Sequence, residues 1–238
     1  MRPVWTLLAV RIFGGCGAES PESGPELAPL RIGGVLGDTA VEGFARADAP
    51  RKFQFPRDHA AHDDFRSEWW YLTMTLRDEQ DQDIGVQFTV FRQALSPEAA
   101  GDNPWQSNQA YLGHLAVTDV AAGRHREFER FARGHPALAG SRPEPFGVWL
   151  DGWRLAADTA GVWRLEARED GVLIDLQLIA RQPFVLQGER GLSRKGPGQA
   201  SYYFSVPRFE VSGTVTLDGS RRRVSGGGWY DREWSTSV

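Results

Sequence analysis

The feature that most constrains this chain is a two-residue alternation of apolar and polar side chains that begins near Glu68. In residues 69–76 every second side chain is apolar, and this set comprises Trp70, Leu72, Met74 and Leu76. The acidic run 78–83 interrupts the alternation, and residues 84–91 then repeat it. Because residues two apart share one face of a strand, the pattern predicts two strands with one buried face each, joined by an exposed hairpin loop.

Similar runs recur along the rest of the chain, separated by Gly, Pro or Asp. They lie near residues 110–120, 126–133, 147–156, 161–168, 171–180, 201–206, 209–217 and 223–230. None has the 3.6-residue period of a strong amphipathic helix, and the 27 Gly and 14 Pro residues favour turns over long helices. We therefore predict an all-β chain that folds as a meandering antiparallel β-barrel or sandwich.

Of these two architectures, a barrel with an internal cavity fits better. Polar residues, among them Gln87, Arg92 and His114, fall between aromatic residues at positions that we expect to face inward. A closed barrel has no exposed sheet edge, and its interior is reached from the mouth. The nine Trp and 13 Phe residues supply the flat apolar surface that suits the lining of a cavity.

The charge pattern excludes some partners. The net charge is −4, and the longest basic run is residues 221–223, whereas nucleic-acid-binding proteins present a larger basic face. We therefore expect no nucleic-acid partner. Beyond the N-terminus no segment approaches the roughly 20 apolar residues that span a bilayer, so we expect attachment to a membrane by a lipid anchor only.

The N-terminal residues 1–16 have the features of a signal peptide. Arg2 is followed by the apolar stretch 4–10 and by small residues before Cys16. The position of Cys16 resembles a bacterial lipobox, in which the cysteine is lipidated. We therefore expect an exported lipoprotein in the periplasm or on the outer face of a bacterial membrane, and the alternative is an uncleaved N-terminus. Residues 17–40 begin with an acidic Pro-, Ser- and Gly-rich stretch that predicts a flexible linker.

A cluster of histidine and carboxylate side chains lies at residues 58–64. His59 and His62, with their acidic neighbours, could ligate a divalent metal ion. The spacing offers no third defined ligand, so we predict no metal site, and a loop at the barrel mouth whose side chains cap turns explains the cluster better. A ligand-contacting or proton-transferring role for one histidine is a third possibility.

Near the end of the sequence, Asp231 is surrounded by the aromatic residues Trp229, Tyr230 and Trp234. A carboxylic acid among indole rings has its charged form disfavoured, which raises its pKa and lets it donate a proton. Asp231 is thus a candidate general acid, with Trp229 and Tyr230 beside it. The alternative is that Asp231 forms an ion pair with Arg232 at a strand end, and the sequence leaves both possibilities open.

Seven segments in fixed order resemble the AttH / carotenoid 1,2-hydratase family. They are Phe55-Pro56-x-Asp58-His59-x-x-His62, Glu68-Trp69-Trp70-Tyr71, Gln87-Phe88-Thr89-Val90-Phe91-Arg92, Ala110-Tyr111-Leu112-x-His114, Gly188-x-x-Gly191-Leu192-Ser193-x-Lys195-Gly196, Ala200-Ser201-Tyr202-Tyr203-Phe204-Ser205 and Trp229-x-Asp231-Arg232-Glu233-Trp234. The resemblance covers residues 53–238 and implies a lipocalin-like barrel. In this two-domain family it also implies a barrel domain over 41–218 and the start of a second barrel-like domain at 219–238, which would leave Trp229 and Trp234 exposed.

The resemblance implies two functions. One is an exported, membrane-anchored protein that binds an apolar lipid or isoprenoid ligand, in possible association with an ABC transport system. The other is a hydratase or hydrolase that needs no cofactor and uses Asp231 as its general acid. The residues that the resemblance assigns to ligand binding are His59, His62, Trp69, Trp70, Tyr71, Gln87, Arg92, His114 and Tyr203.

Overall fold

The hairpin predicted from the alternation is formed by strands β1 (Ser67–Asp78) and β2 (Asp83–Ala94), in which Trp70 lies opposite Val90. Its loop is held by Asp78, whose carboxylate accepts hydrogen bonds from the backbone N–H groups of Gln80 (2.9 Å) and Gln82 (3.0 Å). This turn-forming use of an aspartate side chain explains why an acidic run stands between the strands.

In the computed structural model, which describes residues 42–98, 101 and 103–236, eleven further strands continue this hairpin into one antiparallel sheet. They are β3 (Gln109–Asp119), β4 (Arg124–Arg133), β5 (Ala139–Pro143), β6 (Phe146–Leu150), β7 (Trp153–Ala157), β8 (Trp163–Glu169), β9 (Val172–Ala180), β10 (Val185–Leu186), β11 (Leu192–Gly196), β12 (Gln199–Leu217) and β13 (Ser220–Ser235). The predicted run 147–156 is divided between β6 and β7 by a turn at Asp151 and Gly152, both with positive φ. The predicted signal peptide, Cys16 and the linker lie outside the described residues.

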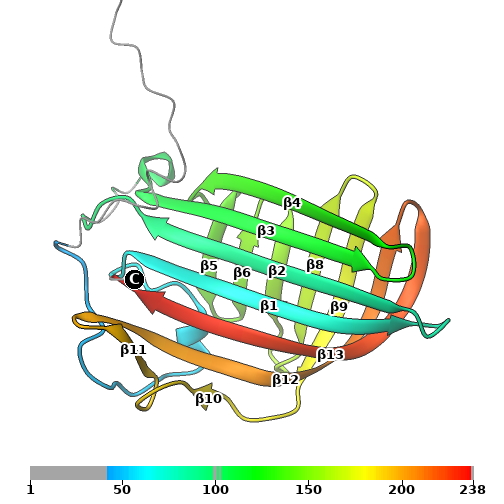
Figure 1. Ribbon diagram of the computed structural model, residues 1–238. Helices are drawn as coiled ribbons and strands as arrows, with labels where there is room; N and C mark the ends of the chain where they lie inside the picture. Colours follow the sequence, from blue (N-terminus) through cyan, green and yellow to red (C-terminus); the bar gives the residue numbers. More distant parts are fainter. Residues whose placement is uncertain (1–41, 99–100, 102, 237–238) are drawn as a thin grey trace, which may run out of the picture.

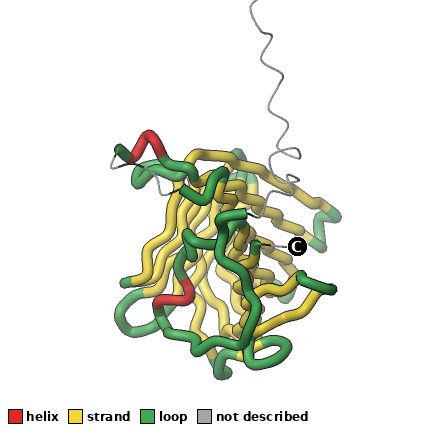
Figure 2. Tube along the Cα trace, turned by 90° about the vertical axis from the view of Figure 1, so that its left-hand side faces the viewer, coloured by secondary structure: helices red, strands yellow, loops and turns green. Residues whose placement is uncertain are grey.

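The sheet curls into a nearly closed barrel. Its strands follow the order β4-β3-β2-β1-β13-β12-β9-β8-β7-β6-β5, and β10 and β11 pair with β12. Figure 1 shows β1 to β4 with β12 and β13 as one layer and β5 to β9 crossing behind it, and Figure 2 shows the sheet curving around between the two layers. The predicted all-β, lipocalin-like antiparallel barrel is therefore confirmed.

The described residues contain two short 3-10 helices, η1 (Arg57–His59) and η2 (Pro104–Gln106), and no α-helix. No helix in this described part of the chain is long and apolar enough to span a membrane. The helix η1 lies in the segment that precedes β1, and its position matters because it carries His59.

The centre of the barrel is filled by side chains. Residues at alternate positions of β1 and β2 point inward, and Leu72 and Phe88 among them are completely buried, as is Trp153 of β7. Apolar side chains from β8, β9 and β12 complete the core. The predicted interior cavity stays a prediction.

The predicted domain boundary at residue 219 is wrong, because the segment that follows it belongs to the same barrel. Strand β13 lies between β1 and β12, and its Arg232 is opposite Trp70. The close fit of β13 against β1 depends on Gly226, where a Cβ atom would lie 2.2 Å from the Thr75 carbonyl oxygen. The boundary falls in the turn that joins β12 to β13. Because β13 (Ser220–Ser235) pairs with a strand on each side, it is an interior strand of the sheet.

The sheet's two end strands, β4 and β5, are not joined by a continuous ladder. Towards one end of the barrel, arginine side chains of β4 bridge the gap between the layers instead. Arg130 donates to Glu169 of β8 at 2.5 Å, and Arg126 pairs with Asp218 in the turn before β13. Side-chain ion pairs therefore hold this part of the seam together, where backbone hydrogen bonds do not.

Candidate functional site

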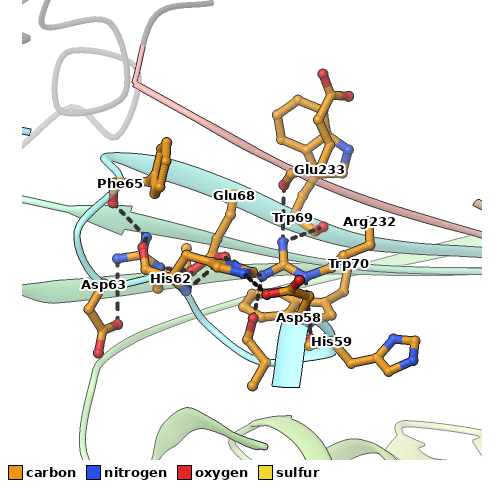
Figure 3. A network of polar contacts seen from close by, with 12 residues as sticks. Asp58, His59, His62, Asp63, Phe65, Glu68, Trp69, Trp70, Arg232 and Glu233 are labelled. Atoms are coloured by element: carbon orange, nitrogen blue, oxygen red, sulfur yellow. Dashed lines mark hydrogen bonds and ion pairs between the residues drawn. The ribbon is translucent and has the colours of Figure 1, made fainter. Parts of the chain in front are cut away.

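A buried polar network closes the barrel end that carries η1 (Figure 3). At its centre is Glu68, whose carboxylate receives hydrogen bonds from Arg92 of β2, Arg232 of β13 and the backbone N–H of His62 (3.0 Å). Burial alone would raise the pKa of Glu68, but the two guanidinium groups hold it well below its usual range. The charge of Glu68 is therefore permanent at neutral pH and fully paired.

Asp58 extends this network into η1. Its carboxylate accepts hydrogen bonds from the Gln54 backbone N–H (2.6 Å) and from Arg51 (3.0 Å), and it lies 3.2 Å from His62 Nε2. Burial acts to raise the pKa of Asp58, but the contacts with His62, Gln54 and Arg51 lower it below its ordinary value. His62 thus bridges two carboxylates, because its Nδ1 lies 3.2 Å from Glu68.

Aromatic rings support the charged groups of this network. The Arg232 guanidinium lies 4.1 Å from the ring centroid of Trp70, and the His62 ring stacks on Trp234 with a centroid distance of 3.8 Å. Trp70 Nε1 and Arg232 also donate hydrogen bonds to the His59 carbonyl oxygen, at 2.7 and 3.3 Å. The network therefore fixes the backbone of η1 and with it the position of His59.

The His59 side chain points away from the network (Figure 3). It packs within a group of aromatic rings, which is called the His59 chamber below. Six rings surround it at centroid distances of 4.9 to 6.2 Å, namely Phe55, Phe146, Trp163, Phe184, Phe204 and Tyr230. They come from the segment before η1, from β6, β8, β12 and β13, and from the loop before β10. Residues far apart in the sequence thus build one apolar enclosure at the barrel mouth.

Two polar atoms in this chamber have no hydrogen-bond partner among the described residues. They are His59 Nδ1 and the hydroxyl oxygen of Tyr230, and both residues are at least 96% inaccessible to solvent. Burial and the nearby Arg232 charge lower the pKa of His59 to about 3, so its imidazole is neutral at physiological pH. Leaving a buried polar group unpaired costs about 1–3 kcal/mol. The chamber therefore holds a donor and a neutral imidazole, each able to bond an incoming polar group.

The chamber is covered on its solvent side by two phenylalanine rings. Phe55 and Phe184 lie 4.2 Å apart between ring centroids, and each is 37% exposed. Both belong to irregular segments outside the barrel strands. Displacement of these two rings would open the chamber without disturbing the sheet.

Asp231 lies on the opposite side of β13 from this chamber. Strand alternation directs Tyr230 inward and Trp229 and Asp231 to the outer face of the barrel. The Asp231 carboxylate accepts hydrogen bonds from Tyr203 (3.0 Å) and Ser205 (2.5 Å), both on β12. Burial and the Asp231 charge raise the pKa of Tyr203 to about 12, so its phenol remains a donor. Asp231 is thus part of a separate polar cluster on the outer face.

The predicted ligand-binding residues fall into two groups. Those that face into the barrel or its mouth are His59, His62, Trp70 and Arg92. Those that lie on the outer face are Trp69, Tyr71, Gln87, His114 and Tyr203. The prediction that Gln87 and His114 face inward is wrong, because Gln87 is exposed and His114 is an exposed partner of Glu129. The predicted exposure of Trp234 is also wrong, since only Trp229 of that pair is exposed.

The positions of His59 and His62 bear on the metal alternative. They belong to one short segment, but their rings point in different directions, and both nitrogens of His62 contact carboxylates. Within the described ranges no group of three His, Cys, Asp or Glu side chains is placed to hold a metal ion. The cluster at 58–64 instead organises the barrel mouth.

Sequence reasoning missed several residues of the chamber. Phe146, Trp163, Phe184 and Phe204 were not assigned to any site, because each comes from a different strand or loop. The available signal was the inward position of Trp163 and Phe204 in their strands, which alternation alone could have given. Their convergence on His59 depends on barrel closure and could not be read from a single strand.

Comparison with known proteins places this geometry in context. A family model described as AttH-like matches residues 46–238. The crystal structure of an AttH-type protein from Nitrosomonas europaea superposes with a TM-score of 0.71 at 34% identity, over 82% of this chain and 59% of that one. Kievitone hydratase from Nectria haematococca matches with a TM-score of 0.58 at 14% identity, over 82% of this chain and 55% of that enzyme. No curated protein matches at a significant level.

The chain therefore spans less than two thirds of the length of both solved structures. At 14% identity the likeness to kievitone hydratase concerns the fold alone. The match to the bacterial protein is closer in both sequence and shape.

Proposed function

Because the chain belongs to the AttH-like family, whose model matches residues 46–238, we propose that its barrel mouth binds an apolar lipid or isoprenoid ligand that carries one polar group. The observation that supports this most directly is the pair of unpaired polar atoms, on His59 and Tyr230, inside an aromatic chamber. Mouths of β-barrels are preferred places for small-molecule sites, which are lined mainly by apolar rings with a few oriented polar groups.

The state of the two polar groups defines the ligand's polar end. A neutral His59 offers a lone pair or an N–H, and Tyr230, whose pKa is raised by burial, offers a phenol O–H. A hydroxyl or carbonyl group on the ligand can satisfy both. A charged head group is disfavoured, because it would have to be desolvated among rings that offer no opposite charge.

The proposal is tested by titrating the protein with farnesol, an isoprenoid alcohol, and following tryptophan fluorescence. Trp163 lies 4.9 Å from His59 between ring centroids, so an occupied chamber should alter its emission. His59→Phe keeps an aromatic ring but removes the polar nitrogen, and we expect its dissociation constant to rise about tenfold, the value of one hydrogen bond.

The matched control is His125→Phe, which makes the same exchange at an exposed histidine on β4 whose Nδ1 lies 2.9 Å from the Thr118 hydroxyl. Its affinity for farnesol should equal that of the unaltered protein. Equal affinity in the His59→Phe and His125→Phe variants would contradict the proposal.

A second candidate function is that of a hydratase that needs no cofactor, acting at Asp231. The observation in its favour is the cluster of Asp231 with two hydroxyl donors on an outer face that also carries Trp69, Tyr71 and Trp229. Hydration of an alkene requires protonation of a carbon and then addition of water, so Asp231 would first have to take up a proton before donating it, and the neighbouring rings would stabilise the resulting cation. The chamber is less suited to that step, since burial makes Tyr230 a weaker acid and keeps His59 neutral, and a neutral imidazole is a far weaker acid than an imidazolium ion.

This second candidate is tested by incubating the protein with an acyclic carotenoid such as lycopene and measuring hydroxylated product. Product that is lost in Asp231→Asn, with farnesol binding unchanged, would favour catalysis on the outer face. Turnover that persists in Asp231→Asn would sink the Asp231 mechanism.

Export, lipidation at Cys16 and association with an ABC transport system complete the proposal. They rest on the N-terminal sequence and on the family resemblance. Expression in a bacterium with labelled palmitate tests the anchor. We expect label and membrane association in the unaltered chain and neither in Cys16→Ser.

A further inference from the structure

A cleft of about 430 Å³ lies at the seam of the barrel, separate from the His59 chamber. It is found where the first residues of β3 and the end of β4 face strand β5 and its neighbour β6, the side of the sheet on which no continuous ladder runs. Small-molecule sites occupy roughly 300–1,000 Å³, so the cleft can hold a compact ligand.

Three aromatic side chains give the cleft flat walls. Trp149 of β6 lies across Gly140 of β5 so closely that a Cβ atom at residue 140 would be 2.7 Å from the indole ring. Tyr111 of β3 is a further lining residue. At one side His135, which lines the cleft, stacks under Trp105 with a centroid distance of 4.1 Å, and Trp105 is 62% exposed. A glycine at 140 is thus what allows one of these walls to form.

The cleft also has polar groups that the fold does not use. Ser141 Oγ and Trp149 Nε1 are buried without a hydrogen-bond partner in the described part of the chain. Tyr111, which is only 4% exposed, adds a phenol hydroxyl to the lining. All three groups can donate, and an indole N–H can only donate. A ligand that satisfies them must offer a hydrogen-bond acceptor.

The charge of the lining restricts the ligand further. Among the described residues that line the cleft, Asp63 is the one carboxylate, and there is no lysine or arginine. The Arg92 guanidinium lies 3.9 Å from Asp63 and is engaged by Glu68. An anionic ligand would therefore meet a like charge at Asp63.

We propose that this seam cleft, which is lined by Tyr111, Trp149 and His135 and supported by Trp105 stacked on His135, is a second binding site for a small, uncharged aromatic molecule that carries a hydrogen-bond acceptor such as a hydroxyl or carbonyl oxygen. The ring of such a molecule lies between the aromatic walls, and its oxygen accepts from the unpaired donors. The site is independent of the ligand at the barrel mouth, because Phe55 and Phe184 cover that chamber elsewhere.

The experiment compares three probes of nearly equal size by saturation-transfer NMR and calorimetry. The probes are 2-phenylethanol, ethylbenzene, which lacks the oxygen, and phenylacetate, which is an anion. We expect 2-phenylethanol to bind with one-to-one stoichiometry, ethylbenzene to bind at least fivefold more weakly, and phenylacetate at least tenfold more weakly. Asp63→Asn should reduce the discrimination against phenylacetate while leaving 2-phenylethanol binding within about twofold.

The site is located by Trp105→Ala, a substitution at an exposed position that should not affect folding. It removes the outer part of the Trp105–His135 stack, and we expect a loss of 2-phenylethanol affinity of fivefold or more. Phe131→Ala removes an aromatic ring that is 56% exposed on the outside of β4, and it serves as the matched control with unchanged affinity.

Any of four results would overturn the proposal. One is no detectable binding of 2-phenylethanol. Another is equal affinity of the Trp105→Ala and Phe131→Ala variants. The third is tighter binding of phenylacetate than of 2-phenylethanol. Binding that is unaffected by Trp105→Ala but lowered by Phe55→Ala would assign the probe to the barrel mouth, and the seam cleft would then not be the site.

Discussion

Tyr230 and Asp231 are neighbours in one strand, but their side chains lie on opposite faces of the sheet, in two chemically different regions. Tyr230 faces the barrel mouth, where its hydroxyl and His59 Nδ1 lack partners among apolar rings. Asp231 faces outward, where its carboxylate is bonded by Tyr203 and Ser205. The inner region is apolar with unsatisfied polar atoms, and the outer region is half-exposed and satisfied.

The difference shows which polar groups are committed to the fold. In the Glu68 network the carboxylate is paired with Arg92 and Arg232 and contacts His62. These groups therefore stabilise the barrel end and are not free to bind a ligand. The polar atoms of the His59 chamber are the reverse, since they lower stability until something bonds them. Polar groups whose hydrogen bonds are all formed within the fold are thus structural, and polar groups without a partner are candidates for binding, although both kinds belong to the same sequence motifs.

The largest expected effect comes from breaking the network. Glu68→Gln leaves Arg92 and Arg232 buried without their counter-charge, and we expect the free energy of unfolding to fall by about 3–5 kcal/mol. Asp231→Asn on the outer face keeps an acceptor for Tyr203 and Ser205 and should cost about 1 kcal/mol or less. Urea denaturation followed by tryptophan fluorescence measures both. Similar losses in the two variants would remove the distinction between the regions.

The next effect is a dependence of stability on pH that belongs to the inner region. The folded protein holds the pKa of His59 at about 3, below its ordinary 6.5, so the unfolded chain binds more protons between these values. The stability contribution is fully present above about pH 6.5 and is lost as the pH falls towards 3. From pH 6.5 to 4.5 the expected loss is about 2–3 kcal/mol.

The control for this prediction is His59→Phe, which removes the titrating group. Its free energy of unfolding should change less between pH 6.5 and 4.5 than that of the unaltered protein. The number of protons taken up on unfolding, given by the slope of this free energy against pH, should be smaller by close to one. Below about pH 4.5 Glu68, whose pKa is also lowered, adds a further loss in both proteins. Identical slopes above that pH would show that His59 is not the buried neutral group described.

The fold was predictable from the sequence because most strands carry their own signal, although the short strands β5, β10 and β11 were not predicted. The alternation at Trp70 to Leu76 identifies the inner face of β1 without any knowledge of its neighbours. The domain boundary was not predictable in this way, because whether 220–235 pairs with β1 or begins another domain depends on contacts across more than 140 residues. The two-domain organisation implied by the resemblance placed the division at residue 219, in the turn between two paired strands.

The site was only partly predictable for the same reason. Motif residues next to each other, such as Trp69 and Trp70, were assigned to one site, but strand alternation sends them to opposite faces. The direction of His59 depends on how Trp70 and Arg232 hold its carbonyl oxygen. Arg92 was placed correctly in the interior, yet its role in pairing Glu68 follows from a cross-strand register that the sequence does not state.

The smallest expected effect gives the sharpest test, because one exchange should act with opposite sign on the two sides of the sheet. Tyr230→Phe removes a buried hydroxyl that has no partner, so stability should be unchanged or rise by up to about 1 kcal/mol. Tyr203→Phe removes a hydroxyl that donates to Asp231, so stability should fall by about 0.5–1.5 kcal/mol. Both values come from urea denaturation at pH 7, where neither phenol titrates. A loss in Tyr230→Phe equal to that in Tyr203→Phe would mean that the inner hydroxyl is already bonded, and the chamber would then lack the free group on which ligand binding depends.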